Sequence, residues 1–419
     1  MRKILIFIII MFSAAVLYAE NYFTLIAQVG STPSSFVFSS NDVMYAGTIG
    51  SGVYKSEDYG DTWVQLNNGL TDLNVFSLAM NSAGQIIAGT GNGSVFVTSN
   101  NGASWTRTNL NAASKVKTLA YTTSGAIFTG VENDGIYRTL DNGNTWQRVK
   151  GTVDIYTIAV NSSGVIFAGA GVPDEGVFRS SDEGNTWIKV LSTEHNVNSI
   201  AMNYAGTIFA VTGNLETADN PLGDVLARSK DGGSTWDFFY SFGSSSYGLV
   251  LNSLGHLFLG RYRVVWISTD KGESWELQSS GLELGYGILI SYGINSQGFV
   301  YAGQEGGYIY RTTVNTIGIK KLSEQVPSVF KLYQNYPNPF NPSTIIKFDI
   351  PAGVKGGKSN VKIVIYDVLG KQVAVLLDEK LSTGTYEVNW DASNYPSGLY
   401  FYKLVTEKYA VTGKMMLVK

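Results

Sequence analysis

One eight-residue motif occurs six times between residues 56 and 275, and this repetition limits the architectures open to the chain. The motif reads Ser/Thr-x-Asp-x-Gly-x-Ser/Thr-Trp, with Asn100 in place of Asp once. A period of about 40 residues is typical of repeat proteins in which each repeat forms one supersecondary unit. A catalytic group is needed once, so a motif present six times has to be explained first as part of the repeat. Its tryptophans, which are 42, 41, 41, 49 and 39 residues apart, are Trp63, Trp105, Trp146, Trp187, Trp236 and Trp275.

Each repeat also contains four short runs rich in Val, Ile, Phe and Tyr, separated by turns rich in Gly, Asn and Ser. One such turn, NSAG at 81–84, precedes the second run, and the eight-residue motif joins the third run to the fourth. Short β-branched and aromatic runs between turn signals predict antiparallel strands, and four such strands make one blade of a β-propeller. Helical periodicity is absent, so the sequence predicts an all-β fold.

The number of blades follows from the first three strands of each repeat. These sets begin near residues 36, 75, 117, 155, 198, 247 and 290, which makes seven. Only six sets are followed by the motif and a fourth strand, whereas residues 21–29 form a candidate strand with no partner of its own. A closed ring leaves no exposed sheet edge. We therefore predict a seven-bladed β-propeller whose N-terminal strand closes the last blade; a six-bladed ring with one stray repeat is the alternative.

The residue types of the motif suit a tight reversal of the chain. Asp58 can accept hydrogen bonds from N–H groups of its own turn, Gly60 can adopt positive φ, and Trp63 can bury a large ring against neighbouring strands. The motif resembles the Asp-box (BNR) repeat of sialidases and other β-propellers, in which the boxes lie on turns away from the ligand face. The resemblance implies a structural role for Asp58, Gly60, Trp63, Asn100, Gly102, Trp105, Asp141, Gly143, Trp146, Asp182, Gly184, Trp187, Asp231, Gly233, Trp236, Asp270, Gly272 and Trp275.

The first residues have the composition of a secretory signal. Arg2 and Lys3 precede an apolar run from residue 4 to residue 17, and YAEN follows. We predict a signal peptide at 1–19, cleaved after Ala19, and no later segment is long and apolar enough to span a membrane. The chain has no cysteine, which excludes disulfides, thiolate metal sites and a cysteine nucleophile.

Charge divides the chain into an acidic part and a basic part. Residues 1–314 hold 17 Lys+Arg and 25 Asp+Glu, whereas residues 315–419 hold 13 and 8. An acidic surface does not attract a phosphate backbone, so nucleic acid is not expected as a partner. The two histidines, His195 and His256, lie in different repeats without metal-ligand spacing, so neither a metal site nor a cofactor is predicted.

The pattern changes after a predicted linker at 314–330. Residues 332–351, LYQNYPNPFNPSTIIKFDIP, contain four of the chain's nine prolines, and alternating runs such as SGLYFYKLV (397–405) then predict a small Ig-like β-sandwich. This stretch resembles the type A C-terminal sorting domain of the type IX secretion system, which implies export across the outer membrane of a Gram-negative bacterium. A plain adhesive sandwich is the alternative. The sorting motif comprises Asn335, Tyr336, Pro337, Asn338, Pro339, Phe340, Asn341 and Pro342, and the resemblance continues at Tyr366, Asp367, Gly370, Gly384, Tyr386, Trp390, Asp391, Ser397, Gly398 and Tyr400.

The resemblance to sialidases raises the question of catalysis. A sialidase requires three arginines that converge on a carboxylate, a Tyr–Glu nucleophile pair and an acid/base Asp. Four arginines, Arg138, Arg179, Arg228 and Arg311, occupy the same position in the third strand of their repeats, so their repetition indicates a structural role. No catalytic residue is assigned. A glycoside hydrolase with two carboxylates on facing loops is the alternative to a binding protein.

Ligand binding is expected where the repeats differ, on the loops opposite the boxes. These loops join the second strand to the third and the fourth strand to the next repeat; two of the shorter ones are ENDG (132–135) and GVPDEG (171–176). The longest loop, at 212–224, adds three acidic residues, and repeat six carries RYRVVW (261–266) where other repeats have Gly and Asn. An arginine pair can hold a carboxylate, and a tyrosine can stack on a sugar or an aromatic ring. The candidate ligand-binding residues are Arg261, Tyr262, Arg263, Glu216, Asp219 and Asp224; salt bridging of these arginines to neighbouring acids is the alternative.

The sequence therefore predicts a signal peptide at 1–19, a β-propeller at 20–313, a linker at 314–330 and a sorting domain at 331–419. The chain is expected to be an exported binding module that passes through the periplasm and is then secreted or held on the outer cell surface. Its expected partners are the type IX secretion machinery and a glycan or extracellular protein.

Overall fold

A computed structural model describes most of the chain, and every named element in it is a β-strand. Among the described residues no helix is long and apolar enough to cross a membrane. The predicted signal peptide at 1–19 lies outside these residues. The described residues are 21–151, 153–203, 206–213, 225–241, 246–252, 255–261, 263–282, 287–295, 298–313, 316, 319–323, 327–341, 343–351, 358–392, 395–407 and 409–419.

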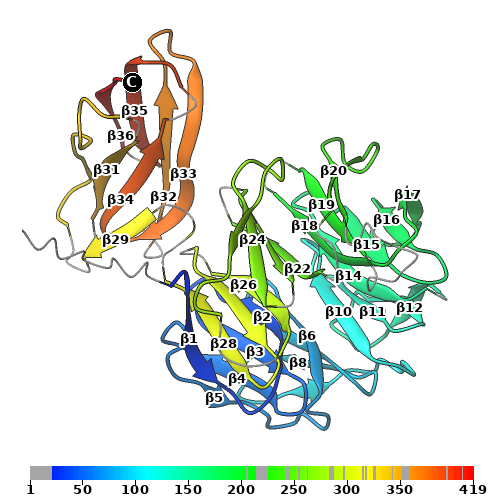
Figure 1. Ribbon diagram of the computed structural model, residues 1–419. Coiled ribbons are helices and arrows are strands. Elements are labelled where there is room, and N and C mark those ends of the chain that lie inside the picture. The colour runs from blue at the N-terminus through cyan, green and yellow to red at the C-terminus, as the bar shows by residue number, and fades with distance from the viewer. Residues whose placement is uncertain are drawn as a thin grey trace, which may run out of the picture.

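Seven four-stranded antiparallel sheets, the blades, form the larger part of the described chain (Figure 1). The first strands contact one another in sequence around a closed ring, and β26 contacts β2. They are β2 (Pro33–Phe38), β6 (Val75–Met80), β10 (Val116–Tyr121), β14 (Ile155–Val160), β18 (Val197–Met202), β22 (Ser246–Leu251) and β26 (Leu289–Ile294). The second strands are β3 (Met44–Thr48), β7 (Ile86–Thr90), β11 (Ile127–Val131), β15 (Ile166–Ala170), β19 (Ile208–Thr212), β23 (Leu257–Arg261) and β27 (Val300–Gln304).

The outer half of each blade is built from a third and a fourth strand. The third strands are β4 (Gly52–Ser56), β8 (Val95–Thr98), β12 (Gly135–Thr139), β16 (Gly176–Ser180), β20 (Val225–Ser229), β24 (Val264–Ser268) and β28 (Tyr308–Thr312). The fourth strands of blades one to six are β5 (Val64–Gln65), β9 (Thr106–Arg107), β13 (Gln147–Lys150), β17 (Ile188–Ser192), β21 (Asp237–Ser241) and β25 (Glu276–Gln278). The seven strand sets start within three residues of their predicted positions, which confirms the seven-bladed all-β prediction.

The last blade takes its fourth strand from the other end of the chain. Strand β1 (Phe23–Gln28) pairs antiparallel with β28, with Phe23 opposite Thr312 and Gln28 opposite Tyr308. In Figure 1 the blue β1 lies beside the yellow β28. Phe23 is fully buried, so the strand contributes to the core of the blade as well as to its hydrogen bonding. The N-terminal strand thus closes the ring as predicted.

The second strand of each blade is covered on both faces by the neighbouring blades. In β7 and β11 every residue is buried. Gly89 and Gly130 show why small residues recur here: a Cβ at Gly89 would lie 2.3 Å from Val116 Cγ1, and one at Gly130 would lie 2.5 Å from Ile155 Cγ2. Real Cβ atoms do not approach so closely, so these glycines set the distance between one blade and the first strand of the next.

Hydroxyl groups join the first strands of neighbouring blades around the centre of the ring. The N–H of Leu78 donates to Ser35 Oγ at 3.1 Å, and that of Ile158 donates to Thr118 Oγ1 at the same distance. Ser291 Oγ donates to the carbonyl oxygen of Pro33 at 2.7 Å, which links the last blade to the first. Buried backbone groups must be paired, so these bonds replace the ladder that the inner strands lack on that side.

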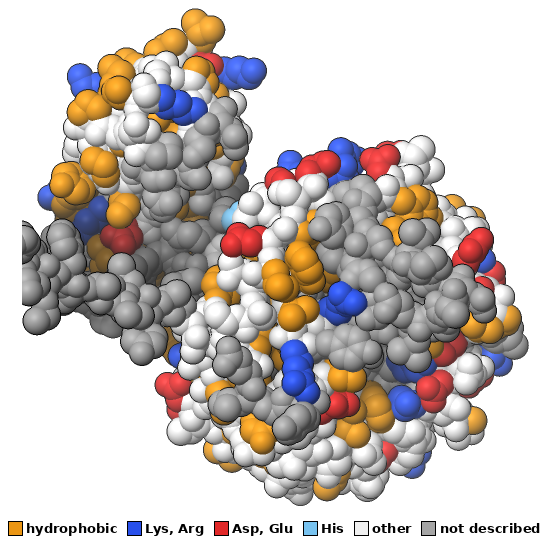
Figure 2. All heavy atoms as spheres, in the orientation of Figure 1, with side chains coloured by type: hydrophobic (Ala, Val, Ile, Leu, Met, Phe, Trp, Pro, Cys, Tyr) orange, Lys and Arg blue, Asp and Glu red, His pale blue; other side chains and the backbone are white. Residues whose placement is uncertain are grey.

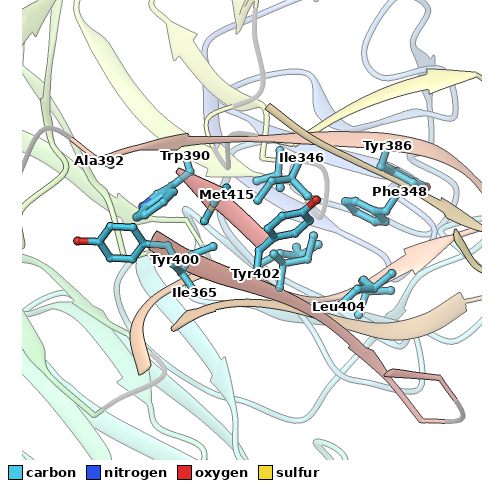
Figure 3. Close-up of a cluster of buried hydrophobic side chains, with 14 of the residues drawn as sticks. Ile346, Phe348, Ile365, Tyr386, Trp390, Ala392, Tyr400, Tyr402, Leu404 and Met415 are labelled. Atoms are coloured by element: carbon cyan, nitrogen blue, oxygen red, sulfur yellow. The ribbon is translucent and has the colours of Figure 1, made fainter. Parts of the chain in front are cut away.

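The C-terminal part is a sandwich of two four-stranded sheets around a separate core (Figure 3). Trp390 packs against Tyr400 and Phe340 in this core, with ring centroids 5.2 and 5.5 Å apart. One sheet has the order β29 (Ile319–Ser323), β34 (Gly384–Asp391), β31 (Ser343–Ile350) and β30 (Lys331–Leu332). The other has the order β33 (Gln372–Ser382), β32 (Lys358–Tyr366), β35 (Gly398–Thr406) and β36 (Ala410–Leu417).

The structure differs from the sequence prediction at the start of this sandwich. Residues 314–330 were predicted to be a linker, but β29 lies within them and pairs antiparallel with β34. Its sequence, IKKLS, contains no aromatic residue, and the strand lies at the edge of its sheet, where it needs only one partner. The sheet therefore begins before the predicted boundary at residue 331.

Candidate functional site

The six eight-residue motifs form turns with one shared geometry at one end of the blades. In the fourth, Ser180 Oγ donates to Asp182 Oδ1 at 2.8 Å and accepts the N–H of Gly184 at 2.8 Å. The second carboxylate oxygen accepts the hydroxyl of Thr186 at 2.6 Å, and the Thr186 N–H donates to Oδ1 at 2.9 Å. Trp187 Nε1 donates to the Gly184 carbonyl at 3.1 Å, which fixes the indole over the turn. The hydroxyls of Ser180 and Thr186, the Asp182 carboxylate and the Trp187 indole N–H are thus all used inside the turn.

The second motif shows how Asn replaces Asp. Asn100 Oδ1 accepts the Thr98 hydroxyl at 2.7 Å and the Ser104 N–H at 3.0 Å, as the Asp carboxylates do. Its Nδ2 donates to Ser104 Oγ at 2.9 Å, so only the direction of this last bond is reversed. Trp105 is buried and donates to the Leu66 carbonyl of the preceding repeat, whereas the other five motif tryptophans are half-buried rather than fully enclosed as expected.

The residue before the motif glycine adopts a left-handed conformation in every motif. The φ angles lie between 56° and 71°, and the glycines that follow also have positive φ. Non-glycine side chains rarely adopt this conformation, so the hydrogen bonds of the turn hold them there. The residues are Tyr59, Asn101, Asn142, Glu183, Gly232 and Lys271.

These hydrogen bonds also hold the motif carboxylates ionised. The hydroxyl and N–H of the following Thr, together with the Ser/Thr two residues before, lower the pKa of Asp58, Asp141, Asp182 and Asp231 from 3.8 to about 2. A carboxylate whose pKa is lower in the folded state stabilises the fold above pH 4 and loses that effect as the pH falls toward 2.

We therefore expect the thermal stability of the protein to decline between pH 4 and pH 2. In a variant with Asn at positions 58, 141, 182 and 231, the geometry of Asn100 keeps the turns intact, but no carboxylate titrates there. Its melting temperature should fall less steeply across this interval and stay close to the parent value at pH 7. Thermal unfolding followed by circular dichroism from pH 2 to pH 7 measures both, and parallel curves for the two proteins would contradict the assignment.

Three of the four third-strand arginines contact three different turns, each in the next blade, and so do not converge. Arg138 donates to the carbonyl of Glu183 in the next blade's turn, Arg228 to that of Lys271, and Arg311 to that of Tyr59. Each carbonyl belongs to the left-handed residue of the motif. These contacts support the structural interpretation that repetition indicated, for Arg138, Arg228 and Arg311.

The opposite face is built from loops that are tied together by one repeated bond. The N–H of the residue after the second strand donates to the carbonyl of the residue just before the first strand of the same blade, at 2.8–3.0 Å. The backbone is therefore alike from blade to blade, and the side chains are free to vary. The described pairs are Ile49–Thr32, Gly91–Asn74, Glu132–Lys115, Gly171–Asp154, Gly213–Asn196 and Glu305–Ile288.

Charged and aromatic side chains gather on this face at blades two to four. Lys117 Nζ contacts both carboxylate oxygens of Asp154 at 2.8 and 2.9 Å and lies 3.3 Å from Glu132. Its ammonium also lies 3.9 Å from the centre of the Tyr156 ring. Lys115 contacts Glu132 at 3.4 Å. Oppositely charged groups with an aromatic face offer donors, acceptors and a stacking surface in one place.

Burial and neighbouring charges shift the pKa values of Lys117 and Glu132 in opposite directions. Burial alone would lower the pKa of Lys117, but its hydrogen bond to Asp154 and the charge of that carboxylate raise it above its ordinary value. Burial alone would raise the pKa of Glu132, but Lys117 and Lys115 lower it. Both shifts favour the charged forms of Lys117 and Glu132. On the face that Figure 2 shows, the described acidic and basic side chains are interspersed.

A shallow hollow adjoins this cluster between blades two and three. It is lined by the Phe76 ring, the Lys115 ammonium, and polar side chains from both loop types. Lys115 Nζ lies 4.6 Å from the centre of the Phe76 ring, and Asp72 holds the loop through the N–H of Asn92 at 2.9 Å. We call the hollow and its neighbours Phe76, Lys115, Lys117, Glu132, Asp154 and Tyr156 the charged cluster.

The sequence prediction placed the binding residues elsewhere on this face. Arg261 ends β23 and Arg263 lies exposed in the turn before β24, so both belong to the predicted loop set of blade six. Tyr262, Glu216, Asp219 and Asp224 lie outside the described residues. Of the charged cluster, only Glu132 lay in a loop singled out from the sequence. The other five residues of the cluster lie immediately before the first strand of their blade or at its second position. At the position before the first strand, five of the seven repeats carry Thr, Asn, Lys or Asp.

Comparisons with known proteins agree with the C-terminal sandwich and with the propeller. The profile of the secretion system C-terminal sorting domain matches residues 334–419. This match indicates export through the type IX secretion system to the cell surface or the medium. No curated protein sequence matches the chain significantly.

Solved structures similar to the chain are β-propellers. YCF48 bound to D1 peptide is 15% identical with a TM-score of 0.56, over 70% of this chain and 97% of that one. PorZ, a surface component of the type IX secretion system of Porphyromonas gingivalis, is 15% identical with a TM-score of 0.54, over 93% of this chain and 60% of that one. Virginiamycin B lyase of Staphylococcus aureus is 13% identical with a TM-score of 0.58, over 70% of this chain and 98% of that one. Identities this low establish the fold alone.

Proposed function

We propose that the chain is an exported β-propeller that binds a glycan or an extracellular protein through the face opposite the repeated turns. The observation that carries this proposal is the contrast between the two faces. On one face six turns repeat the same bonds, whereas on the other the same backbone bond carries a different side chain in nearly every blade. Structure alone explains the repeated face, so the varied face is the one that needs a ligand to account for it.

The repeated turns are proposed to be Asp boxes of the BNR type. The bonding of the carboxylate, the left-handed residue and the glycine supports this assignment. We also propose that residues 1–19 are a signal peptide, that 20–313 form the propeller, and that the sorting domain comprises 331–419 together with β29 from the preceding segment. Cleavage after Ala19 would leave β1 only three residues away from the new N-terminus, so the closing strand would stay intact.

Two sites on the varied face are candidates for the ligand. The charged cluster offers an aromatic ring, an ammonium group and carboxylates around a hollow, which suits sugar hydroxyls or a peptide. The second candidate is the set predicted from sequence in blades five and six, Arg261, Tyr262, Arg263, Glu216, Asp219 and Asp224. Either site would bind without cofactor or metal.

The alternative to binding alone is a glycoside hydrolase. Such an enzyme needs one carboxylic acid whose pKa is raised so that it can protonate the leaving group. Glu132 and Asp154 in the charged cluster both contact Lys117, and Lys117 and Lys115 lower the pKa of Glu132. Binding therefore accounts better for Glu132 than proton donation does.

We expect the full chain to bind members of an array of glycans and bacterial surface proteins without consuming them. In the variant Phe76→Leu/Lys115→Gln, the aromatic face and the ammonium are lost while the buried volume stays similar. Affinity should fall at least tenfold, about 1.4 kcal/mol. Isothermal titration with the bound array member measures this. The matched control is Arg261→Gln/Arg263→Gln, which should bind normally if the charged cluster is the site and weakly if the second set is.

Release of reducing ends from the bound glycan, abolished by Glu132→Gln, would contradict a pure binding role and establish the hydrolase instead.

A further inference from the structure

The interfaces between blades contain a repeated clamp on the face of the turns. The clearest example joins blade seven to blade one. Arg311 Nη1 donates to the carbonyl of Tyr59 at 2.9 Å and lies 3.7 Å from the Asp61 carboxylate, while the hydroxyl of Tyr301 donates to the same carbonyl at 3.3 Å. The guanidinium fills the space between the two blades and ties the turn of one to the third strand of the other.

The same clamp recurs at two more interfaces. Arg228 Nη1 donates to the Lys271 carbonyl at 3.0 Å and to Glu273 Oε1 at 2.7 Å. Arg138 donates to the Glu183 carbonyl and, at 2.9 Å, to Asn185 Oδ1. In each case the acceptors are the carbonyl of the left-handed residue and the side chain two residues after it. These positions are equivalent to Tyr59 and Asp61 in the first turn.

The interface between blades one and two keeps half of this arrangement. Tyr45 takes the position of Tyr301 and donates to the Asn101 carbonyl at 3.4 Å. Lys55 is opposite Tyr45 in the strand register, just as Arg311 is opposite Tyr301. However, Lys55 turns to its own neighbour Glu57 and forms an ion pair with it. The position equivalent to Asp61 is Ala103, so neither the arginine nor its acidic acceptor is present.

A hollow of about 480 Å³ lies where the other interfaces hold the guanidinium. Its lining includes Asn101, whose carbonyl accepts the Tyr45 hydroxyl, together with Tyr45 itself, the Lys55–Glu57 pair and Met80. The residue whose carbonyl the arginine uses elsewhere therefore lines the hollow, next to the hydroxyl of the buried Tyr45. The Glu57 carboxylate, whose side chain is 69% exposed, can share its charge with an incoming cation.

We propose that this hollow binds the guanidinium of an arginine side chain supplied by a partner protein. The incoming group takes the place that Arg311 takes at the interface of blades seven and one: it donates to the Asn101 carbonyl beside the Tyr45 hydroxyl and pairs with Glu57. The site lies on the face of the turns, so it is distinct from the proposed ligand face and does not depend on it. It gives the propeller a second contact, with a basic protein segment.

The methionines give a direct test. Met80 lines the hollow, and Met202 ends the first strand of blade five at the equivalent position. In the full chain labelled with 13C-methyl methionine, N-acetyl-arginine methylamide should shift the Met80 resonance at millimolar concentration and leave Met202 unchanged. The citrulline analogue has the same shape without the charge, and it should shift Met80 at least fivefold less at the same concentration.

The variant Lys55→Arg/Ala103→Asp rebuilds the clamp of the neighbouring interface. We expect it to abolish the Met80 shift and to raise the melting temperature, because the chain's own guanidinium now fills the hollow. An unchanged Met202 resonance confirms that the variant is folded. Equal shifts with the arginine and citrulline probes, no shift with either, or an arginine shift that persists in the folded variant would each overturn the proposal.

Discussion

A chain that ends at residue 333 is expected to remain in the periplasm instead of reaching the cell surface or the medium. The match to the secretion system C-terminal sorting domain begins at residue 334 and covers the remainder of the chain. The blades and the sandwich have separate hydrophobic cores, so the truncation should remove the sorting domain without unfolding the ring. Cell fractionation and immunoblotting measure the distribution, and we expect nearly all of the truncated chain in the periplasmic fraction.

The truncation needs a control for folding, because a misfolded protein would also be retained. The periplasmic fragment should show the β-sheet circular dichroism and cooperative melting of the ring. A folded fragment found outside the cell at the level of the full chain would show that residues 334–419 are not required for export.

Neighbouring residues of the predicted sorting motif differ in their exposure and bonding. Asn335 is buried and donates to Thr344 Oγ1 at 2.9 Å and to the Pro337 carbonyl at 3.1 Å, whereas Tyr336 is 79% exposed. Residues 335–341 also contact the last strand, where the N–H of Phe340 donates to the Met416 carbonyl. The final motif residue, Pro342, lies outside the described residues. Tyr336 is thus exposed to solvent, while the hydrogen bonds of Asn335 hold the shape of this segment.

Deletion of residues 21–30 is expected to destroy the propeller. Strand β28 would lose its partner along the whole register from Tyr308 to Thr312, and the buried Phe23 would be lost with it. Removing one fully buried Phe side chain costs about 3–5 kcal/mol, and an unpaired strand edge adds a tendency to aggregate. A typical domain has only about 5–15 kcal/mol of stability. We expect the deleted chain to be insoluble or to elute as aggregate in size-exclusion chromatography.

A circular permutation serves as the matched control. If residues 21–30 are moved to follow residue 313 through a short flexible linker, the strand can still pair with β28 and the ring can close. Solubility and the melting temperature of the isolated ring should be restored. A deletion variant that stays monomeric with the parental melting temperature would mean that β1 is dispensable for closure.

The repeat made much of the fold predictable. Local patterns that recur predict four strands per repeat, the turn between the third and fourth strands, and the closing role of residues 21–29. A strand whose pattern is weak in one repeat can be assigned from its counterparts in the others. Strand β29 was missed because it lies outside the repeats and pairs with a strand about 65 residues later. Such a strand is specified by its partner and not by its own sequence.

The candidate site was less predictable for a related reason. Loop composition drew attention to Arg261 and Arg263, since they interrupt the pattern of their repeat. Lys117 and Tyr156, in contrast, lie inside first strands whose pattern they respect, and only the ring brings Lys117 to Asp154 of the next blade, 37 residues away. The hollow beside Lys55 could not be predicted from the sequence either. A lysine in place of an arginine is informative only when the acceptors across the interface are known.

We assign ligand binding to the varied face and structural bonding to the repeated turns. One comparison of affinities tests this assignment most directly. With the array member that the full chain binds, the dissociation constant is measured for Phe76→Leu/Lys115→Gln on the varied face and for Asp182→Ala in a repeated turn. We predict that the first variant loses at least tenfold in affinity at an unchanged melting temperature. The second should melt at a lower temperature and bind with parental affinity. Loss of binding in Asp182→Ala at an unchanged melting temperature would contradict the account, because it would place the ligand on the face of the turns.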